Sequence, residues 1–137
     1  MVLVDTSVWS LALRRHANDL SARDQKLVEV LMDLITDGKA ALIGMIRQEI
    51  LSGIRDPKAF RVLRDRLIDL PYLPVGLAEH DLATSFYNKC ATNGIVASTV
   101  DMLICAAGVS HQMPIFTMDT DFNRYTKYLP LKLLKHP

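Results

Sequence analysis

Cysteine is scarce in this chain, and its spacing points neither to a disulfide framework nor to a zinc site. The two cysteines, Cys90 and Cys105, form no C-x-x-C pair, and the four histidines show no H-E-x-x-H spacing. Disulfide scaffolds and structural zinc sites need such patterns. Cys105 lies in the apolar run 102–109, which is typical of a core residue. A metal ion in this protein must therefore be held by oxygen ligands.

Long hydrophobic runs and a strong excess of charge are also missing. No uninterrupted apolar stretch approaches the roughly 18–20 residues that a membrane span needs. The short apolar run at 1–4 lacks the basic residues that open a secretory signal. Lys and Arg number 16 against 15 Asp and Glu, a formal net charge of +1, which excludes a strongly basic nucleic-acid coat. We expect one domain over residues 1–137 in a soluble, cytoplasmic protein.

Glycine is too sparse and scattered for a phosphate-binding loop. The six glycines form neither G-x-x-x-x-G-K nor G-x-G-x-x-G. These loops bring backbone N–H groups to the phosphates of nucleotides. We therefore expect no nucleotide cofactor.

Short apolar runs alternate along the chain with segments of helical spacing. The apolar runs predict strands at 2–4, 40–43 and 114–117, with weaker edge strands at 70–75 and 131–134. Helical spacing predicts helices at 8–13, 27–35, 45–51, 57–67, 78–93 and 99–109, and turn residues occupy 118–121. This order predicts an α/β sandwich with a mostly parallel central sheet.

Acidic residues stand where the predicted strands end and the next helices begin. Asp5 ends the first strand, and Glu49 lies in the helix after the second. Asp101 opens the helix near 99, and Asp119 follows the last core strand with Asp121 behind it. Taken singly, most of these acids fit helix caps, helix dipoles or turns. The functional crevice of a parallel sheet lies at the carboxyl ends of its strands, and we expect the acids to converge there.

Acids gathered in one crevice need a compensating cation. Two carboxylates about 5 Å apart repel by roughly 3 kcal/mol at an effective dielectric constant of about 20. Oxygen ligands alone select Mg²⁺ or Mn²⁺ over zinc. Such an ion can activate a water as a nucleophile and stabilise a phosphodiester transition state. The pattern therefore predicts a magnesium or manganese site for phosphate chemistry.

The order and setting of these acids also resemble a known family. Four motifs carry the resemblance: Asp5-Thr6-Ser7-Val8-Trp9; Gln48-Glu49-Ile50-Leu51 with Gly53-Ile54-Arg55-Asp56; Thr99-Val100-Asp101-Met102-Leu103-Ile104; and Thr117-Met118-Asp119-Thr120-Asp121-Phe122. They look like the PIN-domain ribonucleases, and within these like the VapC-type toxins of toxin–antitoxin pairs. The resemblance covers nearly the whole chain, from Asp5 to Phe122.

The resemblance implies a fold, an activity and partners. The fold is a three-layer α/β/α sandwich, and the activity is endonucleolytic cleavage of RNA by a metal-activated water, with Mg²⁺ or Mn²⁺ as cofactor. The partners are a second copy of the chain and a cognate VapB-type antitoxin of a type II pair. The match assigns catalysis and metal binding to Asp5, Glu49, Asp101 and Asp119, with Asp121 as a further ligand and the hydroxyls of Thr6 and Thr117 as supporting groups.

Contacts with RNA are less well marked in the sequence. Many relatives carry arginines in the stretch before the third acid, where this chain has Ala91 and Ala97. Arg55, Lys58 and Arg61 recur at steps of three and offer a cationic stripe for RNA phosphates. A solvated helix face explains the same spacing. Likewise, the longer apolar helices suit either a second protomer or an antitoxin helix.

Two other classes of protein fit parts of the pattern. One is a Mg²⁺-binding receiver-like module whose aspartate accepts a phosphoryl group. Receivers need an acidic pair at the end of the first strand, whereas this chain has Asp5-Thr6, and they need a lysine at the last strand, whereas none lies between Lys89 and Lys127. The other is a non-catalytic, RNA-binding PIN-like protein, which has no need of four clustered acids.

Overall fold

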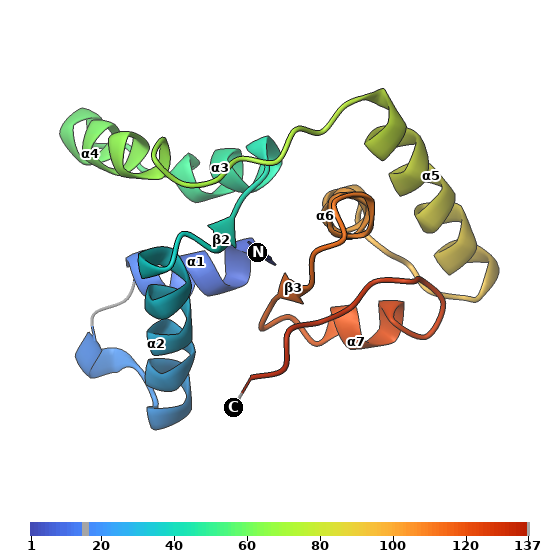
Figure 1. The fold of residues 1–137 in the computed structure, drawn as a ribbon, viewed down its shortest axis with the longest axis horizontal. Coiled ribbons are helices and arrows are strands. Elements are labelled where there is room, and N and C mark those ends of the chain that lie inside the picture. Colours follow the sequence, from blue (N-terminus) through green and yellow to red (C-terminus); the bar gives the residue numbers. More distant parts are fainter. Residues whose placement is uncertain (15–16, 137) are drawn as a thin grey trace.

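A short parallel sheet lies at the centre of the molecule. The computed structural model describes residues 1–14 and 17–136. The elements follow one another as β1 (Val2–Val4), α1 (Thr6–Arg14), the 3-10 helix η1 (Ala17–Asp19), α2 (Ala22–Thr36), β2 (Ala40–Ala41), α3 (Gly44–Leu51), α4 (Pro57–Leu67), α5 (Leu77–Thr92), α6 (Thr99–Ser110), β3 (Ile115–Phe116) and α7 (Asp121–Tyr125) (Figure 1). The strand order is β2-β1-β3, and both pairings are parallel.

All strands of the sheet are buried, as continuous apolar runs require. Leu3 of β1 is fully buried and pairs with Ala41 on one side and with Ile115 on the other. Strands buried on both faces read as apolar runs without polar alternation. Because the strands are parallel, their carboxyl ends meet at one edge, where the chain continues into Asp5 and Thr117.

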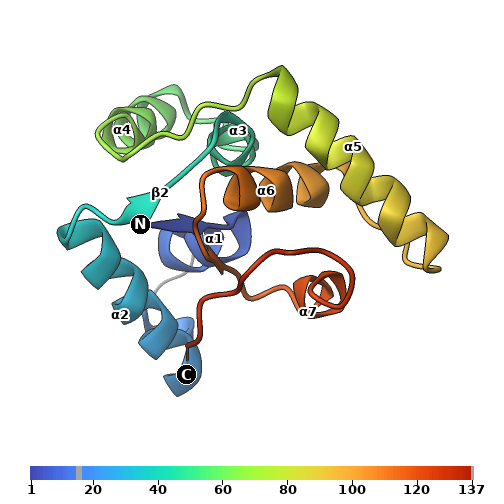
Figure 2. The same ribbon diagram turned by 45° about the vertical axis from the view of Figure 1, so that its right-hand side comes forward.

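Helix α6 is the most deeply buried helix of the second half of the chain. Its residues 102–108 are all buried, because α6 lies between the sheet and α5 (Figures 1 and 2). Gly108 allows this close packing, since a Cβ at that position would come within 3.0 Å of the Ile115 side chain. Cys90 and Cys105 are buried free thiols, which confirms the prediction that Cys105 is a core residue.

The predicted α/β sandwich is confirmed, but two predicted edge strands are wrong as strands. Residues 70–75 contribute an isolated parallel bridge between Tyr72 and Leu42, and residues 131–134 one between Leu133 and Ile115. Pro71 and Pro74 flank the first bridge, and proline cannot donate a ladder hydrogen bond. These segments lie along the sheet without extending it.

Two short elements were not expected from the sequence. The chain forms η1 at 17–19, and the predicted turn at 118–121 leads directly into α7. Helix α7 has 5 residues and buries Phe122 and Tyr125. A helix this short shows no apolar period in the sequence. Among the described helices, none combines the length and the apolar character that crossing a bilayer requires.

Candidate active site

Three carboxylates from the second half of the chain gather at one point. One oxygen each from Asp101, Asp119 and Asp121 lies within 4.8 Å of the other two. Asp101 stands in the first turn of α6, Asp119 lies in the loop between β3 and α7, and Asp121 is the first residue of α7. The N–H of Asp121 donates to Asp119 Oδ1 at 2.9 Å, which fixes the spacing of these two acids. We call Asp101, Asp119 and Asp121 the carboxylate cluster.

Asp5 is held beside this loop by two hydroxyl groups. It is buried, with 6% of its surface exposed, and its Oδ2 accepts hydrogen bonds from Ser7 Oγ and Thr117 Oγ1, each at 2.8 Å. The Thr117 hydroxyl also accepts from the N–H of Asp119 at 3.0 Å, and Ser7 Oγ accepts from the N–H of Met118 at 3.0 Å. The two hydroxyls therefore tie Asp5, at the end of β1, to the loop that carries Asp119.

Glu49 reaches the same edge of the sheet through Thr6. Thr6 Oγ1 donates to Glu49 Oε1 at 2.8 Å, and Thr6 directly follows Asp5 in the chain. The 4.8 Å group of oxygens contains neither Asp5 nor Glu49. The structure thus brings Asp101, Asp119 and Asp121 together and links Asp5 and Glu49 to their surroundings through threonine hydroxyls.

The electrostatics of the site centre on Asp101. Burial raises the pKa of its carboxyl group, and the negative charges of Asp119 and Asp5 raise it further. The phenol of Tyr125 opposes this rise by donating to Asp101 Oδ2 at 2.8 Å. Burial, and then this hydrogen bond, raise the pKa of Tyr125 itself, so the phenol stays a proton donor.

Tyr125 and Ser7 are functional candidates that sequence reasoning missed. Tyr125 follows the last motif and lies on a helix too short to predict. Ser7 belongs to the first motif but has no predicted role, whereas its hydroxyl donates to the Asp5 carboxylate. An S/T hydroxyl two positions after a strand-ending aspartate is a common helix start, and the sequence alone gives no further signal.

The donor set of the cluster fits a hard divalent cation. All three groups are carboxylates, and oxygen-only sites suit Mg²⁺ or Mn²⁺. Their charges are poorly compensated: among the described residues, the ion pair within the cluster joins exposed Asp121 to Arg124 at 3.9 Å. Burial is the largest cause of the raised pKa of Asp101, and the negative charges of Asp119 and Asp5 add to it. A cation placed there would relieve this repulsion.

We expect Asp101→Asn to stabilise the metal-free protein. A carboxyl whose pKa is raised on folding lowers the free energy of unfolding as the pH rises from its ordinary pKa through the raised one. Asparagine carries no charge to repel Asp5 and Asp119, and its carbonyl can still accept the Tyr125 hydrogen bond. In EDTA, the melting temperature of the variant should exceed that of the wild type by a few degrees near neutral pH.

The gain in melting temperature should vanish in acid, where Asp101 of the wild type is protonated in both the folded and the unfolded state. Thermal melts across a pH series check this, with exposed Asp69→Asn as the matched control for loss of an aspartate charge. A variant that melts below the wild type at every pH would show that the Asp101 charge does not strain the site.

With this geometry in hand, comparison with known proteins gives a clear family match. The sequence matches the family described as the PIN domain over residues 2–128. The chain belongs to the PIN-domain family. This membership speaks against the receiver-like alternative, which is a different family. No curated protein matches the chain.

Solved structures share the fold of this PIN domain over nearly its whole length. The FitAcB structure from Neisseria gonorrhoeae is 20% identical with a TM-score of 0.72, and the match covers 98% of this chain and 97% of that one. VapBC2 from Rickettsia felis, bound to a DNA fragment from its promoter, is 13% identical with a TM-score of 0.73, covering 100% of both chains. VapBC-5 from Mycobacterium tuberculosis is 20% identical with a TM-score of 0.65, covering 98% and 97%.

The basic stripe predicted to contact RNA lies away from the carboxylate cluster, on another part of the PIN domain. Arg55, Lys58 and Arg61 are all exposed, on or just before α4. Helix α4 is well separated from α7 in both views (Figures 1 and 2). RNA contact by this stripe stays a prediction. Of the two alanines noted in the stretch before Asp101, Ala91 is exposed and Ala97 is buried.

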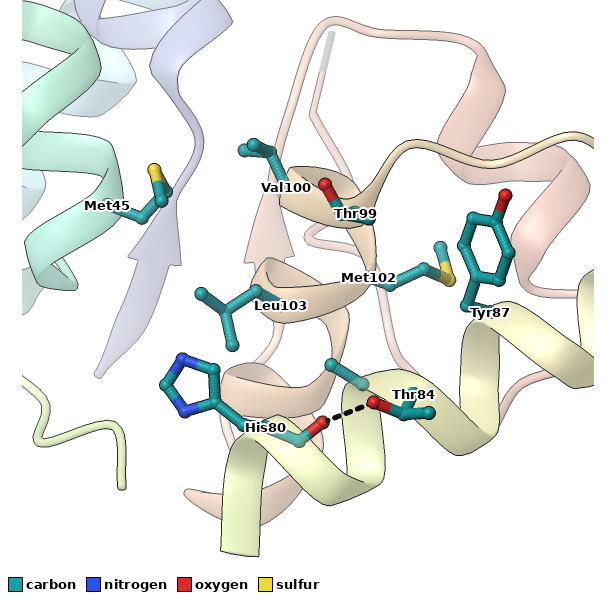
Figure 3. A pocket seen from close by; sticks show the side chains of 9 residues that line it. Met45, His80, Thr84, Tyr87, Thr99, Val100, Met102 and Leu103 are labelled. Atoms are coloured by element: carbon teal, nitrogen blue, oxygen red, sulfur yellow. Dashed lines mark hydrogen bonds between the residues drawn. The ribbon is translucent and has the colours of Figure 1, made fainter. Parts of the chain in front are cut away.

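An apolar groove opens beside the start of α6. It has a volume of about 410 Å³ and is lined by Met45, His80, Ala83, Thr84, Tyr87, Thr99, Val100, Met102 and Leu103. Figure 3 shows Val100 and Leu103 of α6 projecting toward Met45 of α3, with His80 and Thr84 of α5 on the other side. This groove lies next to Asp101 in the sequence but contains none of the acids.

Proposed function

We propose that this PIN domain is a Mg²⁺- or Mn²⁺-dependent endoribonuclease and acts as the toxin of a type II toxin–antitoxin pair. The carboxylate cluster is the observation that carries the proposal, because three acids share one small volume with little positive charge to offset them. Membership of the PIN family and the fold likeness to FitAcB and VapBC structures support it.

Each group of the site has a role in this proposal. Asp101, Asp119 and Asp121 hold the ion, and Asp5 and Glu49 complete the acidic set. When bound, the ion supplies a water of lowered pKa as nucleophile and offsets the charge of the phosphodiester. Tyr125 fixes the orientation of the Asp101 carboxylate through its hydrogen bond.

Threonine and serine hydroxyls position the remaining carboxylates. Thr117 and Ser7 both donate hydrogen bonds to Oδ2 of Asp5, which holds its carboxylate in one orientation. Thr6 does the same for Glu49 through Oε1. Hydrolysis by water in this arrangement leaves a 5′-phosphate and a 3′-hydroxyl. We propose that this activity is cytoplasmic.

Cleavage of purified transfer and ribosomal RNA tests the proposal. In Mg²⁺ or Mn²⁺ we expect discrete fragments, and in EDTA none. Smearing by a contaminating nuclease is excluded by the Asp101→Asn protein purified in the same way. If the RNA stays intact under all conditions and the protein binds no Mn²⁺ in a calorimetric titration, the proposal is wrong. The non-catalytic, RNA-binding alternative would then stand.

We further propose that the chain forms a homodimer and is inhibited by a VapB-type antitoxin. The apolar groove between α3, α5 and α6 supports the dimer, as do the exposed apolar side chains of Leu77 and Val96 at 79% and 91% exposure. Light scattering on the purified chain should give twice its mass of 15.4 kDa. A monomer at micromolar concentration would contradict the dimer without touching the chemistry of the site.

A further inference from the structure

A second groove shares Asp119 with the carboxylate cluster and carries basic side chains. Its volume is about 510 Å³, and the residues that line it include Arg23, Thr117, Asp119, Asn123, Lys135 and His136. Thr117 and Asp119 belong to the site already described, so groove and site are continuous. We call this space the basic groove.

The fold builds the basic groove from segments far apart in the sequence. The segment 131–136 runs beside β3, where the N–H of Leu134 donates to the carbonyl of Ile115 at 2.8 Å. His136 is placed at the same edge, with Nε2 at 3.3 Å from the carbonyl oxygen of Thr117 and its ring stacked at a tilt on Phe116. The C-terminal end lies beside the first turns of α2, which carry Arg23 (Figures 1 and 2).

The groove carries charges of both signs. Asp119 is shared with the cluster, while Arg23 and Lys135 supply positive charge and Asn123 supplies an amide. Both cations are exposed, and neither is ion-paired within the described part of the chain. A polyanion lying across the cluster would therefore meet positive charge and a hydrogen-bond donor as it leaves the acids.

We propose that the basic groove binds the sugar-phosphate backbone of single-stranded RNA next to the cleaved bond, with Arg23 and Lys135 contacting phosphates. This inference rests on the proposed function, since it names where the substrate extends beyond the cluster. Phosphate contacts fix the register of a nucleic acid without reading its sequence, and cations near an acidic site offset its repulsion of the strand. Arg23 and Lys135 are thus positioning residues.

Removing both cations tests the proposal. The parent for binding carries Asp101→Asn, which prevents cleavage, and the probe is a fluorescein-labelled single-stranded RNA of mixed sequence. Adding Arg23→Ala and Lys135→Ala should weaken binding about tenfold at low salt. The slope of log affinity against log salt should shrink by about 1.4, because each phosphate contact to a single strand contributes roughly 0.7. In the otherwise wild-type enzyme, the protein concentration that gives half the maximal single-turnover rate should rise, while the rate at saturating protein stays within about twofold.

The matched control removes the same charge elsewhere. Lys39 precedes β2 at the opposite edge of the sheet and Lys89 lies near the end of α5, and both are exposed. Lys39→Ala with Lys89→Ala should leave affinity and salt slope unchanged. Equal losses of RNA affinity in both double variants would show that the effect comes from net charge alone, and would overturn the proposal that the basic groove binds RNA.

The remaining outcomes separate this inference from the proposed function. Cleavage by the wild type with unaltered RNA affinity in the Arg23→Ala, Lys135→Ala protein would overturn the basic groove alone. A loss of antitoxin affinity in that variant, with RNA affinity intact, would assign the groove to a peptide instead and also overturn the inference. A wild type that neither binds nor cleaves RNA would remove both.

Discussion

Asp101→Asn and Asp119→Asn each lower the single-turnover rate of RNA cleavage by about a hundredfold to a thousandfold, the range for loss of one preorganised group of an active site. Both residues belong to the carboxylate cluster, whose oxygens lie within 4.8 Å of one another. Replacing either carboxylate by an amide keeps the size of the side chain but removes one negative ligand for a divalent ion. Rates at saturating protein and Mg²⁺ measure the loss, and circular dichroism confirms the fold.

Two further variants sharpen this result. Asp69→Asn removes an exposed aspartate after α4 and should cleave at the wild-type rate. Asp121→Asn should lose less than the other cluster variants, because Asp121 is exposed and shares its charge with Arg124. Full activity in both Asp101→Asn and Asp119→Asn would contradict the assignment of the active site.

Trp9→Ala destabilises the domain by about 3–5 kcal/mol, the range for loss of a large buried aromatic side chain. Trp9 is 2% exposed in the core, and its indole Nε1 donates to the carbonyl of Val4 at 3.0 Å. This bond ties α1 to the last residue of β1, directly before Asp5. Urea unfolding followed by circular dichroism measures the change in the free energy of unfolding.

Trp9→Phe separates packing from the hydrogen bond. It keeps most of the buried apolar surface and leaves the Val4 carbonyl without its indole donor, which costs about 1–3 kcal/mol. A Trp9→Ala protein that is as stable as the wild type but binds RNA more weakly would instead assign Trp9 to stacking on RNA bases. Its burial argues for the core.

Much of the fold could be predicted because its core elements follow simple rules. The runs at β1, β2 and β3 are short and apolar, and Ser21 and Ser98 cap their helices by accepting from the N–H groups of Asp24 and Asp101. The rest depends on tertiary contacts. Segments 70–75 and 131–134 look like strands in the sequence, but each lies against the sheet through one bridge. Helix α7 forms because Phe122 and Tyr125 are buried in the core, and no apolar periodicity in the sequence predicts this burial.

The candidate site divides in the same way. The acids at strand ends could be predicted to converge, since parallel strands end at one edge. The sequence does not predict which of these acids lie closest to one another. Asp121 joins Asp101 and Asp119 in the cluster, whereas Asp5 and Glu49 are held next to it by hydroxyl groups. Tyr125 and Asp101, which share a hydrogen bond, are 24 positions apart in the sequence. Arg23 and Lys135, which line the same groove, are 112 positions apart, and only the fold brings such residues together.

The chemistry of the fragment ends tests the central claim most directly. Wild-type protein is incubated with transfer and ribosomal RNA in Mg²⁺ and in EDTA, and the new ends are labelled with and without prior phosphatase treatment. We predict fragments only in Mg²⁺, with 5′-phosphate and 3′-hydroxyl ends, because a water molecule and not the ribose 2′-hydroxyl would attack the phosphorus. Fragments that form equally in EDTA, or that carry 5′-hydroxyl and 2′,3′-cyclic phosphate ends, would contradict a metal-dependent role for the cluster of Asp101, Asp119 and Asp121.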